Sequence, residues 1–328
     1  MKHRLIALLS LTVFLFSAAP SFAAGPDFPV RPIQVIVPYS AGGGTDIAIR
    51  VLADMVKKNL PQGFVVINKV GGGGSIGTSA VSHAKPDGYT LGGAVMGPVT
   101  MMSFFGGLDY TVKDFDFIGL ICKTPIVLAA GKKAPFNTIQ ELITYAKANP
   151  GKISIGNPGA GALNHLLAER FCKVAGIQAK HMPYDGSSKS IPACIGGHID
   201  LVVAHPVELL NHVKAGNMKP LAVFEEKRLE EFPDTPTCLE VGIDHSGASW
   251  KGVIAPKGLP ADVKKVLVDA VGKTIQDPAF IKKMKDLGET VTYMNSEEMQ
   301  AMAFKDAQNM EEVIRALGMY GINEKKKK

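Results

Sequence analysis

Short β-branched runs alternate with longer amphipathic segments along this 328-residue chain, and this alternation limits its fold more than any other feature. Each β-branched run has the length of a buried strand, and each longer segment places apolar residues on one helical face. Strands that alternate with helices imply mainly parallel sheets flanked by helices, so the sequence predicts an α/β protein. We expect strands at 33–37, 65–67, 153–155, 199–203 and 220–224, and helices at 47–60, 75–84, 162–175, 261–275 and 296–317, with a capping box of Thr138 and Glu141 opening another helix.

The N-terminus has the three parts of a secretory signal. Lys2 and Arg4 precede an uncharged apolar run over residues 5–19, and the segment 20–23 places the small residues Ser21 and Ala23 at the two positions that a signal peptidase inspects. A membrane helix is the alternative, but the run is shorter than the ~20 residues that a bilayer core requires. We therefore expect a signal peptide at 1–23 and export to the periplasm.

The net charge of +6 comes from the two ends of the chain. Residues 1–23 contribute +2 and residues 325–328 contribute +4, so the charges of the body between them cancel. Nucleic-acid binding requires Lys and Arg clustered on one surface, which this distribution does not favour. We expect no nucleic-acid partner, and a disordered basic tail at 325–328.

The chain contains four cysteines, at positions 122, 172, 194 and 238. An exported protein can keep disulfides, and a Cys172–Cys194 bridge is one possibility. Buried free thiols are the alternative that we favour, because a body of about 300 residues buries enough apolar surface without cross-links. No spacing resembles a metal site, and we expect neither metal nor cofactor.

Three glycine-rich turns carry most of the chemical information. They span residues 38–46, 68–77 and 156–165, and each follows a predicted strand and opens a predicted helix. Glycine lets the backbone approach a ligand closely. The unpaired N–H groups at a helix N-terminus favour an anion, and in α/β sheets they face the crevice beyond the strand ends. The turns therefore predict an anion site built largely from main-chain amides.

Two enzyme motifs overlap the second turn. Residues 72–77 fit the GxGxxG dinucleotide pattern, but no acidic residue follows about 20 positions later. Residues 73–77 fit the GxSxG nucleophile elbow, so an exported hydrolase using Ser75 is an alternative, with Asp200 and either His205 or His245 completing a triad. A run of four glycines produces both motifs easily, and we do not expect an enzyme.

The chain resembles the substrate-binding proteins of tripartite tricarboxylate transporters, the Bordetella uptake gene family. The resemblance covers nearly the whole chain after the leader. It is carried by residues 28–33, the turn at 38–46, Asn68 with 71–77, and residues 85–91, 159–165, 183–187, 196–201, 214–216, 221–223 with Arg228, 236–242 and 250–256.

This resemblance implies a two-lobed fold of the type II-like periplasmic binding proteins. Lobe 1 would comprise residues 24–122 and 225–328, and lobe 2 would comprise residues 123–224. A small carboxylate would bind in the cleft between them: a di- or tricarboxylate, an aromatic acid or an acidic amino acid. Closure of the lobes would bury it, and the permease subunits of the transporter would then receive it. A partner that presents the ligand to a membrane sensor kinase is the other binding role. We expect a monomer.

The family resemblance also implies ligand-binding positions. Lobe 1 would offer main-chain N–H donors from the turns at 38–46 and 68–77, and lobe 2 would offer them from the turn at 156–165. Asp46 would brace the first of these turns. His165 either fixes its own loop or contacts the ligand, Tyr184 either closes the cleft wall or belongs to the core, and Asp200 binds an ammonium, holds water or orients His205. The expected ligand-binding residues are Ser40, Ala41, Gly42, Gly43, Thr45, Gly73, Gly74, Ser75, Gly159, Ala160, Gly161, Leu163, His165, Tyr184, Asp200 and His205.

Overall fold

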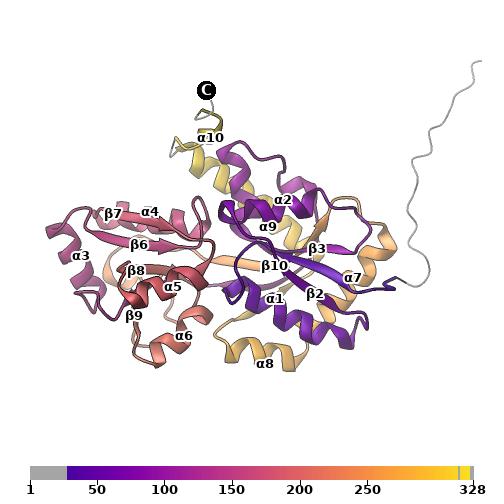
Figure 1. Ribbon diagram of the computed structural model, residues 1–328, viewed down its shortest axis with the longest axis horizontal. Coiled ribbons are helices and arrows are strands. Elements are labelled where there is room, and N and C mark those ends of the chain that lie inside the picture. Colours follow the sequence, from indigo (N-terminus) through magenta and orange to yellow (C-terminus); the bar gives the residue numbers. More distant parts are fainter. Residues whose placement is uncertain (1–27, 317, 326–328) are drawn as a thin grey trace, which may run out of the picture.

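The computed structural model describes residues 28–316 and 318–325, and its strands form two separate sheets (Figure 1). The predicted signal peptide lies outside these residues. The predicted disordered tail is described only at Lys325, which ends a short helix instead.

The sheet of lobe 1 has six strands in the order β11-β4-β10-β3-β1-β2. Strands β1, β2 and β3 pair in parallel, whereas β10 runs antiparallel to both β3 and β4, and β11 is antiparallel to β4. The strands are β1 (Ile33–Val37), β2 (Phe64–Asn68), β3 (Thr90–Val95), β4 (Phe115–Thr124), β10 (Ser249–Pro256) and β11 (Val291–Met294).

The sheet of lobe 2 has five strands in the order β7-β6-β8-β5-β9. Here β6 is parallel to β7 and β8, and β5 is antiparallel to β8 and β9. The strands are β5 (Val127–Gly131), β6 (Ile153–Asn157), β7 (Ala179–Pro183), β8 (Leu201–Ala204) and β9 (Met218–Val223).

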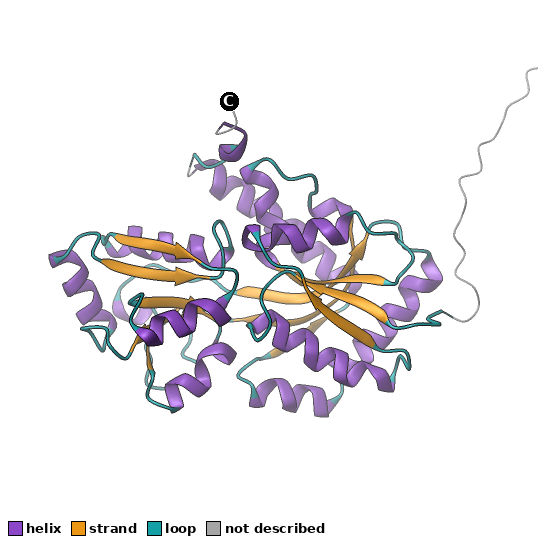
Figure 2. Ribbon diagram, viewed as in Figure 1, coloured by secondary structure: helices purple, strands orange, loops and turns teal. Residues whose placement is uncertain are grey.

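Helices flank both sheets, as Figure 2 shows. They are α1 (Gly44–Met55), α2 (Ser75–Ser82), α3 (Ile139–Ala148), α4 (Leu163–Ala175), α5 (Ser187–Gly196), α6 (Pro206–Lys214), α7 (Ala261–Ile275), α8 (Pro278–Asp286), α9 (Ser296–Ala316) and α10 (Ile322–Lys325). Single helical turns occupy Val56–Lys58, Gly72–Gly74, Gly97–Met101, Met102–Phe105, Val112–Asp114 and Leu239–Val241.

The α/β two-lobed prediction is confirmed, with one refinement: both sheets are mixed. Among the described strands, parallel pairing occurs only within β1 to β3 and within β6 to β8. Strands β5 and β10 follow the two passages between the lobes, and each enters its sheet antiparallel to its neighbours. The apolar runs in the sequence do not show whether β5 and β10 are parallel or antiparallel to their neighbours, because the path of the chain between the lobes sets their direction.

The chain passes between the lobes twice. Residues 125 and 126 separate β4 from β5, and residues 224–248 separate β9 from β10. The family resemblance implies that residues 225–248 belong to lobe 1, but part of this segment packs on lobe 2. Thr237 pairs with Val223 at the end of β9, and Cys238 and Ile243 join the lobe 2 core.

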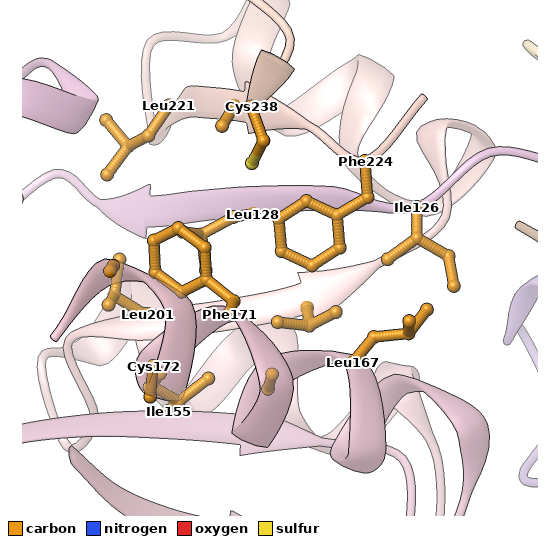
Figure 3. Packing of buried hydrophobic residues seen from close by; sticks show 14 of the residues in the cluster. Ile126, Leu128, Ile155, Leu167, Phe171, Cys172, Leu201, Leu221, Phe224 and Cys238 are labelled. Carbon is orange, nitrogen blue, oxygen red and sulfur yellow. The ribbon is translucent and has the colours of Figure 1, made fainter. Parts of the chain in front are cut away.

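Figure 3 shows the larger of the two apolar clusters that cover the lobe 2 sheet. Phe171 from α4 stacks on Phe224, with ring centroids 5.8 Å apart, and Ile126 and Leu128 pack beside them from the start of β5. All four side chains are fully buried. The cluster therefore holds α4, whose N-terminus faces lobe 1, firmly against its sheet.

All four cysteines are buried free thiols, so the Cys172–Cys194 bridge is absent. Burial raises the pKa of Cys172 and Cys194 to about 12, which keeps both thiols protonated and unreactive at neutral pH.

Replacing Phe171 by Ala should destabilise the protein by about 3–5 kcal/mol, because the substitution leaves a cavity between α4 and the sheet. The measurement is urea-induced unfolding followed by circular dichroism. Val174→Ala is the matched control: it truncates a side chain on the same helix that is 43% exposed, and it should change stability by about 0.5 kcal/mol or less. Equal losses in the two variants would contradict this packing.

Candidate ligand-binding cleft

Five helices begin where the two lobes face each other. Helices α1 and α2 start directly after β1 and β2 in lobe 1, and α4, α5 and α6 start after β6, β7 and β8 in lobe 2. Because these strands are parallel within each lobe, their carboxyl ends share one edge of each sheet. The positive ends of the five helix dipoles are therefore directed toward the boundary between the lobes.

Asp46 braces the first glycine turn from inside α1. Its carboxylate accepts hydrogen bonds from Gly42 N–H (2.9 Å), Arg50 Nε (2.8 Å) and Asn68 Nδ2 (2.8 Å), and the residue is 2% exposed. Burial opposes the charge, but these hydrogen bonds outweigh it and lower the pKa of Asp46. The carboxylate thus shapes the loop from behind, as the sequence analysis expected.

The glycine turns also make direct contacts across the lobes. Ser40 N–H donates to the Asp185 carbonyl (3.2 Å), and the hydroxyls of Ser40 and Ser188 lie 2.6 Å apart. A Cβ on Gly159 would come within 2.5 Å of the Gly73 Cα, so the two backbones touch. The lobes are therefore closed on each other, and several residues expected to face a ligand hold this contact instead.

A small cavity of about 20 Å³ lies between the lobes and opens to solvent. Four of the predicted site residues line it: Gly43, Thr45, Leu163 and His205. Lobe 1 adds Tyr39, Gly44, Val95, Gly97 and Ser249, and lobe 2 adds Pro158, Asn164, Ser187 and Glu208.

The cavity wall contains unpaired donors. Thr45 and Leu163 lie in the first turns of α1 and α4, where helix geometry leaves N–H groups without an intrahelical acceptor. Among the hydrogen bonds of the described residues, none uses either N–H. The Ser249 hydroxyl is 2% exposed and also has no partner in the described part of the chain. Both lobes therefore present donors to the same space.

Glu208 joins the two lobes through its carboxylate. One oxygen accepts Gly44 N–H at the start of α1 (2.5 Å), and the other accepts His205 N–H in a capping box at the start of α6 (2.8 Å). Burial raises the pKa of Glu208, although both N–H donors and the nearby Lys251 oppose the shift. The side chain is thus an acid in the cavity wall that contacts lobe 1 from lobe 2.

Lys251 and Glu289 form a fully buried ion pair behind Glu208. Thr124 Oγ1 donates to the second oxygen of Glu289 (2.9 Å), which satisfies that carboxylate further. Burial opposes the charge on Lys251, but Glu289 outweighs it and raises the pKa of the ammonium. Lys251 therefore has its ion-pair partner inside the protein, and neither residue lines the cavity.

His165 braces the third turn from α4 and does not line the cavity. Its Nδ1 accepts Gly161 N–H (3.0 Å), and its Nε2 lies 3.5 Å from Glu169, which also faces His181 at 3.5 Å. This is the one trio with metal-like spacing among residues 28–316 and 318–325. Because Nδ1 accepts a hydrogen bond, the neutral ring carries its proton on Nε2, which leaves that nitrogen unsuited to a metal.

Two other predicted residues lie elsewhere. The expectation that Asp200 ends a strand near the cleft is wrong. It precedes β8, at the end of the sheet away from lobe 1, and accepts hydrogen bonds from Ser154 N–H (2.8 Å) and Oγ (2.7 Å). It therefore cannot orient His205 at the other end of that strand. Tyr184 packs against a lobe 2 apolar cluster.

The remaining predicted residues lie in the turns but do not line the cavity. They are Ala41, Gly42, Gly74, Ser75, Ala160 and Gly161. The triad of the hydrolase alternative is not assembled, because Asp200 bonds Ser154, His205 lies against the Pro125 carbonyl (3.3 Å), and His245 packs on Phe224. No hydrogen bond within the described ranges links Ser75 to any of the three.

Signals for the missed residues exist in the sequence. Glu208 follows His205-Pro206 at capping-box spacing, and Lys251 interrupts an otherwise uncharged run that reads as a strand. A charge in such a strand requires a buried partner, which the sequence does not name. Val95 and Ser249 also line the cavity, but they lie far from the glycine turns in the sequence. No motif around them indicates a binding site.

Fold and cleft define a two-lobed solute-binding protein of the periplasmic-binding-protein type. The model of the tripartite tricarboxylate transporter family receptor matches residues 48–319, and the chain belongs to this family. A relative from Cupriavidus necator, named "UPF0065 protein in gbd 5'region", is 36% identical over 304 residues, covering 92% of each chain.

Three solved structures share the whole fold. Periplasmic binding protein BugD has 34% identity and a TM-score of 0.85, covering 89% of this chain and 99% of its own. R. palustris Rpa4515 with adipate has 27% identity and a TM-score of 0.84, with 89% and 99% covered. MatC from Rhodopseudomonas palustris with bound malate has 25% identity and a TM-score of 0.82, with 88% and 100% covered. Of the helices in the described part of this chain, none has the length and apolar character needed to cross a bilayer.

Asp46→Asn should destabilise the protein by about 1–3 kcal/mol at pH 7, since the buried bonds to Gly42 and Arg50 lose an ionised acceptor. The pKa of Asp46 is lowered on folding, so its contribution is present above the ordinary pKa and is lost as pH falls through the lowered value. The stability gap between wild type and variant should therefore narrow from pH 7 toward pH 3.

Urea unfolding across this pH range measures the gap. Asp54→Asn, on the same helix with a 71% exposed side chain, is the control and should leave stability nearly unchanged. A gap that stays constant with pH would show that the Asp46 charge does not brace the turn.

Proposed function

We propose that the protein is an extracytoplasmic receptor that captures a small carboxylate by closure of its two lobes and delivers it to the permease of a tripartite transporter. The observation that carries this proposal is the cavity into which α1 and α4 direct their unpaired N–H groups, one helix from each lobe. Family membership and the adipate and malate named with two structural neighbours support the ligand class.

Main-chain donors suffice for useful affinity. A hydrogen bond to a charged acceptor contributes about 1.5–3 kcal/mol, and micromolar affinity corresponds to about 8 kcal/mol. Several preorganised amides from two helix starts reach this range after ordering costs. An arginine in the cavity is therefore not required, which fits a body whose charges cancel.

The remaining parts of the proposal follow the family. We place the protein in the periplasm, as the predicted leader indicates and as BugD is described. We place the lobe boundaries at residues 125–126 and near residue 248. The two lobes would then rotate relative to each other about these two passages of the chain. Amides of Thr45 and Leu163 would contact the ligand, while Ser40, Gly73, Gly159 and Ala160 would meet on closure.

A thermal-shift screen over small carboxylic acids should identify ligands that raise the melting temperature. A ligand at 100 times its dissociation constant adds about 2.7 kcal/mol of stability. Small-angle X-ray scattering with the best ligand should then show an unchanged or smaller radius of gyration. No stabilisation by any acid, or chemical conversion of an acid by the purified protein, would contradict the proposed function.

Gly73→Ala should hinder closure. Gly73 has φ 64°, and a Cβ there would lie 2.7 Å from the Ala160 carbonyl oxygen in the opposite lobe. The added methyl should increase the radius of gyration and weaken binding of the best acid about tenfold or more. Gly216→Ala is the control, because Gly216 has nearly the same backbone (φ 67°) with nothing within 4 Å. Equal effects of both substitutions would assign the loss to backbone strain instead of to contact between the lobes.

A further inference from the structure

Among the cavity-lining residues of the described chain, Glu208 is the only one with a carboxyl group, and both of its oxygens accept backbone N–H groups, which favours the ionised form. The other titratable groups in the wall are His205 and Tyr39. Burial and the nearby Lys251 hold the pKa of His205 well below its usual range, and burial raises the pKa of Tyr39, so both groups are neutral. The charge that an incoming ligand meets in the wall is therefore negative.

The neighbouring charges do not cancel this one. Lys251 already pairs with Glu289, and both are fully buried outside the cavity. Glu289 and Glu208 therefore share one ammonium group, and Lys251 forms its ion pair with Glu289. Glu208 bonds Gly44 N–H at the start of α1 instead.

We propose that Glu208 supplies the cavity's own carboxylate to the N-terminus of α1, so that the cleft selects ligands with a single carboxylate and an uncharged or cationic remainder over dicarboxylates. This inference rests on the proposed function and narrows its ligand class. In the closed protein, Glu208 from lobe 2 occupies a donor of α1 that would otherwise be open to a ligand anion.

The remaining polar groups fit such a ligand. Its carboxylate has the unpaired N–H groups of Thr45 and Leu163 available. The Ser249 hydroxyl, buried and without a partner in the described residues, is open to an uncharged polar group. A hydroxyl or ammonium at the other end of the ligand would find its acceptor in Glu208. A second carboxylate would instead meet like charge.

The size of the selection follows from the separation of the charges. A second negative charge at about 6–12 Å from Glu208, at an effective dielectric constant of about 20, is disfavoured about 10- to 100-fold in affinity. Glu208→Gln keeps the shape and one acceptor oxygen but removes the charge. We expect it to raise the affinity for dicarboxylates relative to monocarboxylates by this factor.

The first experiment uses no ligand. In ¹⁵N-labelled wild-type protein at pH 7.5, the Gly44 amide should resonate downfield and exchange slowly, because it donates to an ionised carboxylate. Glu208→Gln should move this resonance upfield. An unchanged Gly44 resonance would overturn the proposal whatever ligand the protein binds.

The second experiment compares acids of one length and three charges by calorimetry: adipate, hexanoate and 6-aminohexanoate, and the shorter set succinate, butyrate and 4-aminobutyrate. Wild type should bind the monoanion or zwitterion of a set more tightly than the dianion. In Glu208→Gln, affinity for the dianion relative to the monoanion should rise about 10- to 100-fold. The wild-type order is a test by itself if the variant folds poorly.

Glu141→Gln is the matched control. Glu141 also lies at the third position of a lobe 2 helix and accepts an N–H near its N-cap, but it is exposed and does not line the cavity. Its substitution changes the net charge equally and should leave the affinity ratios unchanged. A dianion preference in wild type, or an unchanged ratio in Glu208→Gln, would overturn the selection. Failure of every acid to bind either protein would contradict the proposed function, while the Gly44 resonance would still decide where Glu208 acts.

Discussion

The unpaired N–H groups at helix starts are the constraint on which the rest of this structure depends. Helix geometry leaves them without partners, and parallel strands bring several to one sheet edge. Two lobes then set these edges face to face, with α1 and α2 on one side and α4, α5 and α6 on the other. The resulting space favours an anion without any arginine in its wall.

Closure of the two lobes requires residues without a side chain at two positions in the glycine turns. Gly73 and Gly159 bring two backbones into contact where any Cβ would collide. The loops themselves are held from behind by side chains that do not reach the cavity, Asp46 in lobe 1 and His165 in lobe 2. Rigid loops of this kind let the lobes meet with little reorganisation, and Glu208 adds a polar link between them.

Local pattern predicted part of the site and not the rest. The positions of Thr45 and Leu163 in the site were predictable, because a glycine turn that follows a strand indicates the start of a helix. Ser40, Gly73 and Gly159 lie in the same turns, but whether a turn residue faces a ligand or the other lobe depends on how the lobes approach. The prediction for Asp200 was wrong because the sequence does not show which end of a strand faces the cleft. The direction of β8 places its first residues at the end away from lobe 1.

The sequence by itself determined the α/β class, most helices and strands, and the amide-rich turns, because periodicity and glycine placement are local properties. Tertiary structure alone decided the antiparallel entry of β5 and β10, the packing of Cys238 and Ile243 on lobe 2, and the meeting of Gly44, Glu208 and Lys251. Some of these features join segments far apart in the sequence, such as Gly44 and Lys251. Their positions depend on how two lobes pack across a twice-crossed boundary, which no local pattern records.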